Sequence, residues 1–339
     1  MARDAILKFA FRAVLLLGGV TACVGASAEV PGDHADAAMA ARMNQPYSED
    51  GAQTCLLCHN SHPVDFILQT PMGDKSDPRS PFGQHGCESC HGPAGDHAQQ
   101  KTGPDGNLIL PPVLFKKPKV PWASISPVSQ RNAACLSCHE SGLRMNWKGS
   151  PHESNDLACT SCHTVHAPKD PVLAKATQPE KCFTCHARQE AESLEYSHHP
   201  IREGRVVCSD CHNPHGSPGP SQLKEFSVNE TCYNCHADKR GPFLWEHQPV
   251  RESCVNCHTP HGSNQPRLMK EPLNFLCSSC HSAQANQSGG AFGGAGSIPY
   301  HSQVASTRFN SALANQRQCV NCHSQIHGSN SPSGPFFFR

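Results

Sequence analysis

Charged and apolar side chains are both scarce in this 339-residue chain. Only 17% of the residues are charged and 37% are hydrophobic, and 28 basic side chains balance 28 acidic ones. No basic patch of the kind that binds nucleic acid stands out, so we predict no nucleic-acid partner. After the N-terminal region, no stretch reaches the ~20 apolar residues of a membrane helix. The 29 prolines and 26 glycines argue against long regular elements, and the apolar content is low for an ordinary protein core.

Cysteine and histidine are abundant by comparison, with 21 and 23 copies, and most of the cysteines fall in one motif. Ten segments have the form C-x-x-C-H, and they use 20 of the 21 cysteines. The first cysteines of the motifs are Cys55, Cys87, Cys135, Cys159, Cys182, Cys208, Cys232, Cys254, Cys277 and Cys319. The second cysteines are Cys58, Cys90, Cys138, Cys162, Cys185, Cys211, Cys235, Cys257, Cys280 and Cys322. The histidines are His59, His91, His139, His163, His186, His212, His236, His258, His281 and His323.

The C-x-x-C-H spacing has a chemical reason. Two cysteines three positions apart on one turn reach the two vinyl groups at one edge of a porphyrin and form thioethers, and the following histidine lies under the iron as its proximal ligand. A single copy would also fit a redox dithiol or half a zinc site, but ten copies do not. The sequence therefore predicts ten covalently bound haem c groups and no structural disulfide.

The motifs form a repeat array. They follow one another closely in the middle of the chain, with longer insertions towards both ends, and residues 180–187 closely match residues 230–237. We predict the fold of a multihaem cytochrome c, in which a mostly irregular chain with short α-helices and little β structure wraps around ten haems as an elongated wire. Five motifs fall in each half of the chain, which predicts two pentahaem lobes, residues 55–200 and 201–339.

Residues 1–28 have the pattern of a signal peptide for export. Three basic side chains precede an apolar stretch, and Ala26-Ser27-Ala28 is a cleavage site of the signal-peptidase type. The alternative is a lipid-anchored N-terminus at Cys23. Covalent haem attachment takes place outside the cytoplasmic membrane, so the export signal and the motifs both indicate the periplasm. Residues 29–54 form a polar lead-in that we predict to be flexible.

Thirteen histidines lie outside the motifs, which is enough to give nearly every haem iron a second axial ligand. Six of them recur at fixed offsets from a motif, and two more have little local competition: the eight are His152, His166, His215, His247, His261 and His327, with His97 and His301. An iron with two strong protein ligands has no open position for a substrate, so it carries electrons without bond chemistry. We therefore predict an electron-transfer protein and not an enzyme. The alternative is a multihaem oxidoreductase with one open haem, although the chain lacks the C-x-x-C-K motif of many multihaem nitrite reductases.

Three segments resemble a known family in their linker residues as well as in their haem motifs. They are residues 229–247, residues 208–216 and residues 323–330. The family is that of the periplasmic decahaem cytochromes of outer-membrane porin–cytochrome conduits, the MtrA/MtoA/PioA type, or DmsE family. The resemblance covers the chain from about Tyr47 to the C-terminus.

The resemblance implies a role at the outer membrane. Members lie in or at the periplasmic mouth of an outer-membrane β-barrel porin, receive or deliver electrons through periplasmic carriers, and in some systems meet an extracellular multihaem cytochrome. Members that reduce metals send electrons outward, to metal oxides or to an extracellular dimethyl sulfoxide reductase. Members that oxidise iron bring electrons inward.

The family pattern also bears on two ligand choices. It places a ligand directly before Pro200, which favours His199 over His198. Where metal-reducing relatives carry His-Gly after the first motif, this chain has Met72-Gly73, so we predict Met72 as the sixth ligand of the first haem, with His85 or His62 as alternatives. His/Met ligation raises the potential of a haem relative to bis-histidine ligation. Such a haem suits a relatively high-potential donor such as ferrous iron, which favours inward electron flow.

Overall fold

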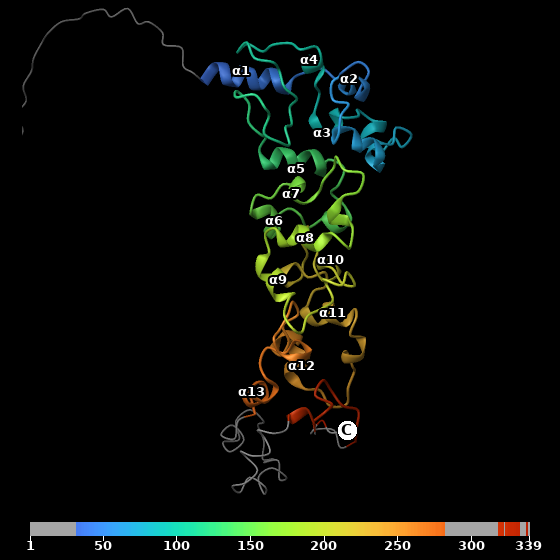
Figure 1. Ribbon diagram of the computed structural model, residues 1–339, viewed down its shortest axis with the longest axis vertical. Helices are drawn as coiled ribbons and strands as arrows, with labels where there is room; N and C mark the ends of the chain where they lie inside the picture. The colour runs from blue at the N-terminus through green and yellow to red at the C-terminus, as the bar shows by residue number, and fades with distance from the viewer. Residues whose placement is uncertain (1–31, 282–317, 322, 333–336, 338–339) are drawn as a thin grey trace, which may run out of the picture.

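The computed structural model describes residues 32–281, 318–321, 323–332 and 337. In this part the chain forms a narrow column, and it progresses along the long axis from its N-terminal helices to its C-terminal ones, although some neighbouring helices are out of sequence order (Figure 1). Helix α1 (Gly32–Met43) lies near one end and α13 (Leu273–Ser278) near the other. A chain that is laid down in this order keeps motifs that are adjacent in sequence adjacent in space.

Short helices account for the regular structure. The longest described helix, α1, has 12 residues, and α5 (Val128–Leu136) has nine. The other α-helices are α2 (Ala52–Leu56), α3 (Glu88–His91), α4 (Gly95–Ala98), α6 (Pro151–Ser154), α7 (Cys159–Cys162), α8 (Gln178–Phe183), α9 (Ala187–Glu192), α10 (Cys208–Cys211), α11 (Val228–Tyr233) and α12 (Gln248–Glu252). The 3-10 helices are η1 (Val64–Gln69), η2 (Pro71–Gly73), η3 (Pro81–Gly83), η4 (Gly142–Arg144), η5 (Pro171–Leu173), η6 (Pro220–Gln222), η7 (Ala237–Lys239), η8 (Cys254–Asn256), η9 (Pro266–Leu268) and η10 (Cys319–Asn321).

Proline explains where many of these turns begin. It stands in the first turn of η2, η3, α6 and η5, among others, because its fixed φ suits a helix start and its missing N–H is not needed there. The hydroxyls of Ser80 and Ser150 cap two of these turns by accepting the backbone N–H of Gly83 and Glu153.

Within the described residues the β structure consists of isolated bridges, with no strand or sheet. Two of them join segments far apart in sequence, Ser197 with Ser263 and Trp245 with Ser329. The prediction of a mostly irregular chain with short helices and little β structure is confirmed. No helix in the described part is both long enough and apolar enough to cross a membrane.

The protein core is thin and divided. The buried hydrophobic side chains of the described part are Ala52, Ile67, Phe82, Ala94, Val113, Trp147, Ala158, Val207 and Met269, scattered along the whole column. One small cluster joins Ala52, Ile67 and Phe82, with Met72, Cys87 and Val165 packed against it. This distribution agrees with the low apolar content of the sequence, since no single core holds the column together.

The segment before the first motif differs from the flexible lead-in that its composition predicts. The Arg42 guanidinium donates to the carbonyls of Pro111 and Pro112, at 2.7 and 2.9 Å. The Gln45 side chain is 5% exposed, donates to the Leu110 carbonyl and accepts the backbone N–H of His97. The lead-in therefore packs on the segment that contains Pro111 and Pro112, and it orients the candidate ligand His97.

The predicted division into two lobes at residue 200 stays a prediction. Helices α8 and α10 lie on either side of that position and contact each other, and the Gln178 side chain accepts the backbone N–H of Ser209 at 3.0 Å. The column thus continues across the expected boundary.

Candidate haem-binding sites

Each C-x-x-C-H motif is wound into a single turn. In all ten, the backbone N–H of the histidine donates to the carbonyl of the first cysteine, at 2.9 to 3.1 Å. This is the four-residue bond of an α-helical turn, and in the nine motifs whose two cysteines are both described it places the side chains at the first and fourth positions on one face. Two sulfurs on one face with the histidine beside them is the arrangement that a covalently bound porphyrin requires.

Eight motif histidines face a second imidazole. The pairs are His59–His97, His91–His166, His152–His186, His163–His215, His199–His236, His212–His261, His247–His281 and His258–His327. Their ring centres are 6.0 to 6.5 Å apart. Two metal–nitrogen bonds of about 2 Å, plus about 1.1 Å from each nitrogen to its ring centre, place two axial imidazoles about 6.2 Å apart. The residues therefore fit bis-histidine haem iron.

Hydrogen bonds fix which ring nitrogen is free to bind iron. The Nδ1 atoms of several paired imidazoles lie 2.6 to 3.1 Å from backbone carbonyls: His91 with Val113, His97 with Ile109, His152 with Pro214, His166 with Val64, His199 with Pro260, His212 with Ser221 and His258 with Arg267. A carbonyl only accepts, so Nδ1 carries the proton and Nε2 keeps its lone pair for the metal.

Burial favours the same protonation state. Desolvation lowers the pKa of His91, His97, His139, His212, His215, His247, His281 and His327. The neutral imidazole, which is the form that binds iron, is therefore the form that the fold stabilises.

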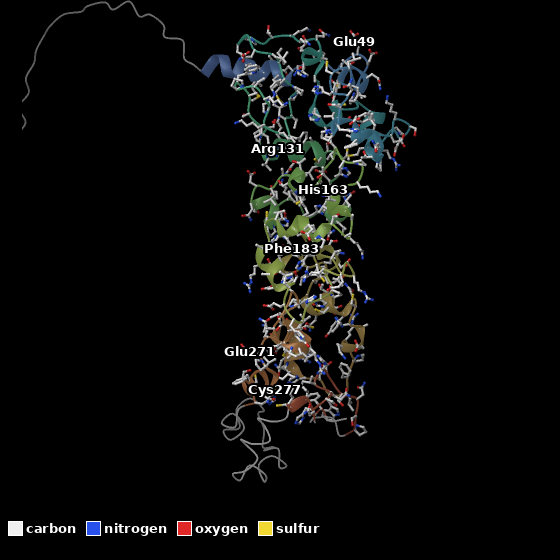
Figure 2. All side chains as sticks on the ribbon, viewed as in Figure 1. Glu49, Arg131, His163, Phe183, Glu271 and Cys277 are labelled. Atoms are coloured by element: carbon white, nitrogen blue, oxygen red, sulfur yellow. The ribbon has the colours of Figure 1, made fainter. Side chains whose placement is uncertain are left out.

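Two of the paired imidazoles have a carboxylate beside their Nδ1 atom. The Asp170 carboxylate accepts the Nδ1 proton of His163 at 2.7 Å, and His163 lies in the middle of the column (Figure 2). The Glu192 carboxylate lies 3.3 Å from Nδ1 of His261. A carboxylate partner makes an imidazole a stronger electron donor to its metal than a carbonyl partner does.

Neighbouring motifs touch through their cysteines in an alternating pattern. First cysteines pair as Cys55–Cys87, Cys135–Cys159, Cys182–Cys208, Cys232–Cys254 and Cys277–Cys319. In the first four pairs the second thiol is the largest cause that raises the pKa of the first, and in the last pair burial raises the pKa of Cys277 most, followed by Cys319. We call each such pair of motifs a unit and number the five units from the N-terminus.

Second cysteines connect one unit to the next. The neighbours are Cys90–Cys138, Cys162–Cys185, Cys211–Cys235 and Cys257–Cys280, and in each of them burial raises the pKa of the first cysteine most and the facing thiol adds to the rise. At all nine junctions, cysteines of consecutive motifs therefore lie near one another. The sequence order of the motifs is also their spatial order, which motif spacing alone does not reveal.

Buried amides hold the two motifs of a unit together. The Asn132 Oδ1 accepts the backbone N–H of Cys159 at 2.8 Å, and the Asn229 Oδ1 accepts that of Cys254 at 2.7 Å. Each asparagine stands three residues before the first cysteine of its own motif. Asn274, in the same position of the fifth unit, accepts from the Cys319 thiol.

Ligands also pass between units. His166, His215, His261 and His327 each face the second haem motif of the unit before their own. His152, His199 and His247 each face the first motif of the following unit. The sequence signalled these histidines by their recurrence but did not assign them to haems.

The geometry separates the candidate sixth ligands. His199 faces His236, whereas His198 bonds the Glu195 carbonyl through Nδ1 at 2.7 Å. The prediction of Met72 as ligand of the first haem does not fit, because His97 faces His59 and Met72 packs against the cluster around Ile67.

The two histidines that could replace Met72 at the first haem are engaged elsewhere. His62 bonds Asp65 and lies over Phe66, and the ring of His85 stacks on Tyr47 with centres 4.1 Å apart. His301 and Cys322 lie outside the described residues.

Known proteins share these motifs. The sequence profile "Doubled CXXCH motif" matches residues 198–241 and 247–286, and "Cytochrome c-type protein NrfB-like" matches residues 87–178. Multiheme cytochrome MtrA of Shewanella baltica is 43% identical over 294 residues, which cover 86% of this chain and 83% of that protein. Cytochrome c-type protein NrfB of Haemophilus influenzae is 27% identical over 190 residues, which cover 48% of this chain and 79% of that protein.

Proposed function

The chain belongs to the family of the multihaem cytochrome MtrA, and we propose that it conducts electrons along ten covalently bound haem c groups across the outer membrane. Multihaem cytochromes of this type are electron-transfer proteins and not enzymes. The proposal assigns the ten C-x-x-C-H motifs as attachment sites, and the eight imidazole pairs as axial ligands of eight haems.

The unbroken succession of motifs is the observation that carries this proposal. Cysteines of each motif lie close enough to those of the next to raise their pKa, through first cysteines within a unit and through second cysteines between units. The porphyrin edges that bear the thioethers would then approach one another along the entire column. Haem iron supplies a reversible ferric/ferrous couple, and the protein's part is to fix spacing, protonation state and ligand strength. A wire that ran only part of the way would have no use for ten ordered motifs.

The same geometry supports a proposal about the partners. We propose that the column lies in an outer-membrane β-barrel porin, with one end open to periplasmic electron carriers and the other to the exterior or to an extracellular multihaem cytochrome. A narrow column whose motifs are ordered along its long axis suits a barrel lumen (Figure 1). Export by residues 1–28 would deliver the chain to the periplasm, where haem is attached.

The proposal also concerns the direction in which electrons flow. The sequence argument for inward flow, as in iron oxidation, depends on a methionine ligand at the first haem, whereas this proposal assigns His97 to that haem because its ring faces His59. Outward flow to metal oxides uses the same wire, so the donor and acceptor decide the direction. Reduction of the holoprotein by ferrous iron, compared with its oxidation by ferric oxide, measures which reaction the haem potentials permit.

Transfer across vesicles tests the conduit. Vesicles that contain reduced methyl viologen and carry the porin together with the holoprotein should reduce external ferric citrate, whereas vesicles with the porin alone should not. Intact mass and haem absorbance should give about ten haems per chain. Equal rates with and without the cytochrome, or a haem count well below ten, would overturn the proposal.

A further inference from the structure

Some sixth ligands come from one unit and face a haem motif of the next unit. Each of them follows the motif histidine before it by a nearly constant number of positions, which we call the register. His152 follows the motif histidine His139 by thirteen positions, and His199 follows His186 by the same interval. His247 follows His236 by two positions fewer. Each of the three faces the histidine of the motif two places further on. The third motif stands two places after the first. The register therefore predicts that the sixth ligand of the third haem comes from the segment after the first motif.

The register can be applied to His139, the histidine of the third motif. Among the described residues, no second imidazole faces it. Met72 follows the first motif histidine, His59, by the same thirteen positions. The two histidines of the same segment are out of register, because His62 follows His59 by only three positions and His85 follows it by twenty-six.

The local structure at Met72 matches that at His152. Both are the second residue of a short helix that begins with proline, η2 for Met72 and α6 for His152. Each of the two also lies in the region of a residue that precedes a backward-reaching ligand. His152 bonds the carbonyl of Pro214, which precedes His215, and Met72 packs in one cluster with Val165, which precedes His166.

A second forward ligand repeats this neighbourhood, because His199 bonds the carbonyl of Pro260, the residue before His261. The third, His247, faces His281 in the same way, although its Nδ1 atom forms no hydrogen bond. The same place in the repeat is thus occupied by histidine three times and by methionine once.

The segment that carries Met72 is held in place on both sides. Before it, the Val64 carbonyl accepts from Nδ1 of His166, and the Thr70 hydroxyl bonds the Ile67 carbonyl. A side chain at Gly73 would collide with the Ile67 carbonyl, so η2 packs closely on η1.

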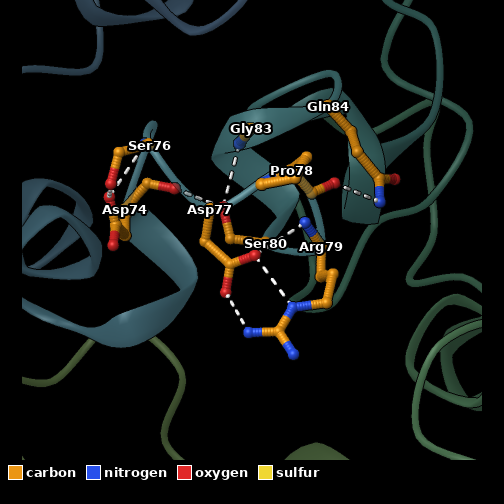
Figure 3. A network of polar contacts seen from close by, with 8 residues as sticks. All are labelled: Asp74, Ser76, Asp77, Pro78, Arg79, Ser80, Gly83 and Gln84. Carbon is orange, nitrogen blue, oxygen red and sulfur yellow. Dashed lines mark hydrogen bonds and ion pairs between the residues drawn. The ribbon is translucent and has the colours of Figure 1, made fainter.

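After it, a network of polar contacts closes the loop from Asp74 to Gln84 (Figure 3). The Asp74 carboxylate accepts from Ser76, the Asp77 carboxylate accepts from Arg79, and the Ser80 hydroxyl bonds the Asp74 carbonyl. Met72 is therefore positioned by a rigid frame.

We propose that the Sδ atom of Met72 is the sixth ligand of the third haem, opposite His139. The inference rests on the haem loading of the proposed function but not on a membrane location or a direction of flow. A thioether ligand raises the potential of its haem relative to bis-histidine haems. The third haem would then be a high-potential site inside the wire, one unit away from its N-terminal end.

Spectra of the purified ferric holoprotein test this assignment. The wild type should show the far-red methionine–iron charge-transfer band, and about one tenth of the haem should titrate at a distinctly higher potential than the rest. Met72→Leu should abolish the band and create one high-spin haem that binds carbon monoxide. Met72→His should abolish it without an open haem and bring the high-potential component down to the others. Met145→Leu, at a methionine that is 72% exposed, is the matched control and should leave the band unchanged.

A second variant identifies the haem. His97→Ala should create a high-spin first haem while the methionine band persists, because Met72 serves another iron. The proposal is overturned if the wild type lacks the band, if the band survives in Met72→Leu, or if His97→Ala yields no high-spin haem. Loss of the conduit activity in vesicles would leave these spectra unaffected, so the two proposals fail separately.

Discussion

We predict that a substitution at Asp170 changes the reduction potential of one haem. Its carboxylate accepts the Nδ1 proton of His163 at 2.7 Å, and the side chain is only 15% exposed. The negative charge makes the imidazole a stronger donor and stabilises the ferric iron more than the ferrous iron. Asp170→Asn keeps the shape and a hydrogen-bond acceptor but removes the charge. The potential of the fourth haem should therefore rise.

The size of the effect follows from the bond that is weakened. A hydrogen bond to a charged group contributes about 1.5–3 kcal/mol, and a neutral one about half of that. A loss of about 1.4 kcal/mol in the preference for ferric iron corresponds to about 60 mV in a one-electron couple. One tenth of the haem absorbance should shift upward by this amount in a spectroelectrochemical titration.

Asp65→Asn is the matched control. Asp65 accepts from Nδ1 of His62 at the same 2.7 Å, but His62 faces no motif histidine. This variant should leave all potentials within the error of the titration. An unchanged or lowered potential in Asp170→Asn, or an equal shift in Asp65→Asn, would refute the reasoning that the carboxylate acts through a coordinated imidazole.

Three further predictions concern ligands, ring orientation and stability. His199→Ala should open one haem to carbon monoxide, measured by difference spectra, whereas His198→Ala should not. Electron paramagnetic resonance of the ferric protein should show rhombic signals from imidazole planes 8° to 10° apart and large-g signals from planes 55° to 68° apart; a single class would contradict the ring angles. Asn229→Ala should lower the free energy of unfolding by ~2–3 kcal/mol in denaturant titrations, and the exposed Asn234→Ala by less than ~0.5 kcal/mol.

The attachment sites could be predicted from sequence because each is local. A cysteine, a second cysteine three residues later and an adjacent histidine need only one turn of chain, and the bond from His59 to the Cys55 carbonyl shows that turn. The fold class followed from the same motifs, since short spacings and many prolines leave room only for short helices. Local chemistry of this kind is fully written in consecutive letters.

The sixth ligands could not be assigned because their contacts are not local. His166 reaches back past two motifs to His91, and His199 reaches forward past one motif to His236. Motif spacing carries no sign of these connections, so the sequence pattern assigns Met72 to the nearest motif, that of the first haem. Met72 and Val165 pack against the same cluster, and this shared packing places the Met72 segment near the following unit.

The reciprocal exchange of ligands explains how a thin column can hold together. At each of the last three junctions between units, one histidine passes forward and one passes back: His152 with His215, His199 with His261, and His247 with His327. Two metal–ligand bonds would therefore cross every junction, where an ordinary domain would place a hydrophobic interface.

The first junction has the same form if Met72 passes forward while His166 passes back. A thioether binds ferric iron more weakly than an imidazole does, so this junction would be the least firmly tied of the four in the oxidised protein. Met72→His should then raise the midpoint of chemical unfolding of the ferric holoprotein, with a smaller gain in the ferrous form. A methionine at position 72 would thus lower the stability of the first junction and raise the reduction potential of the third haem.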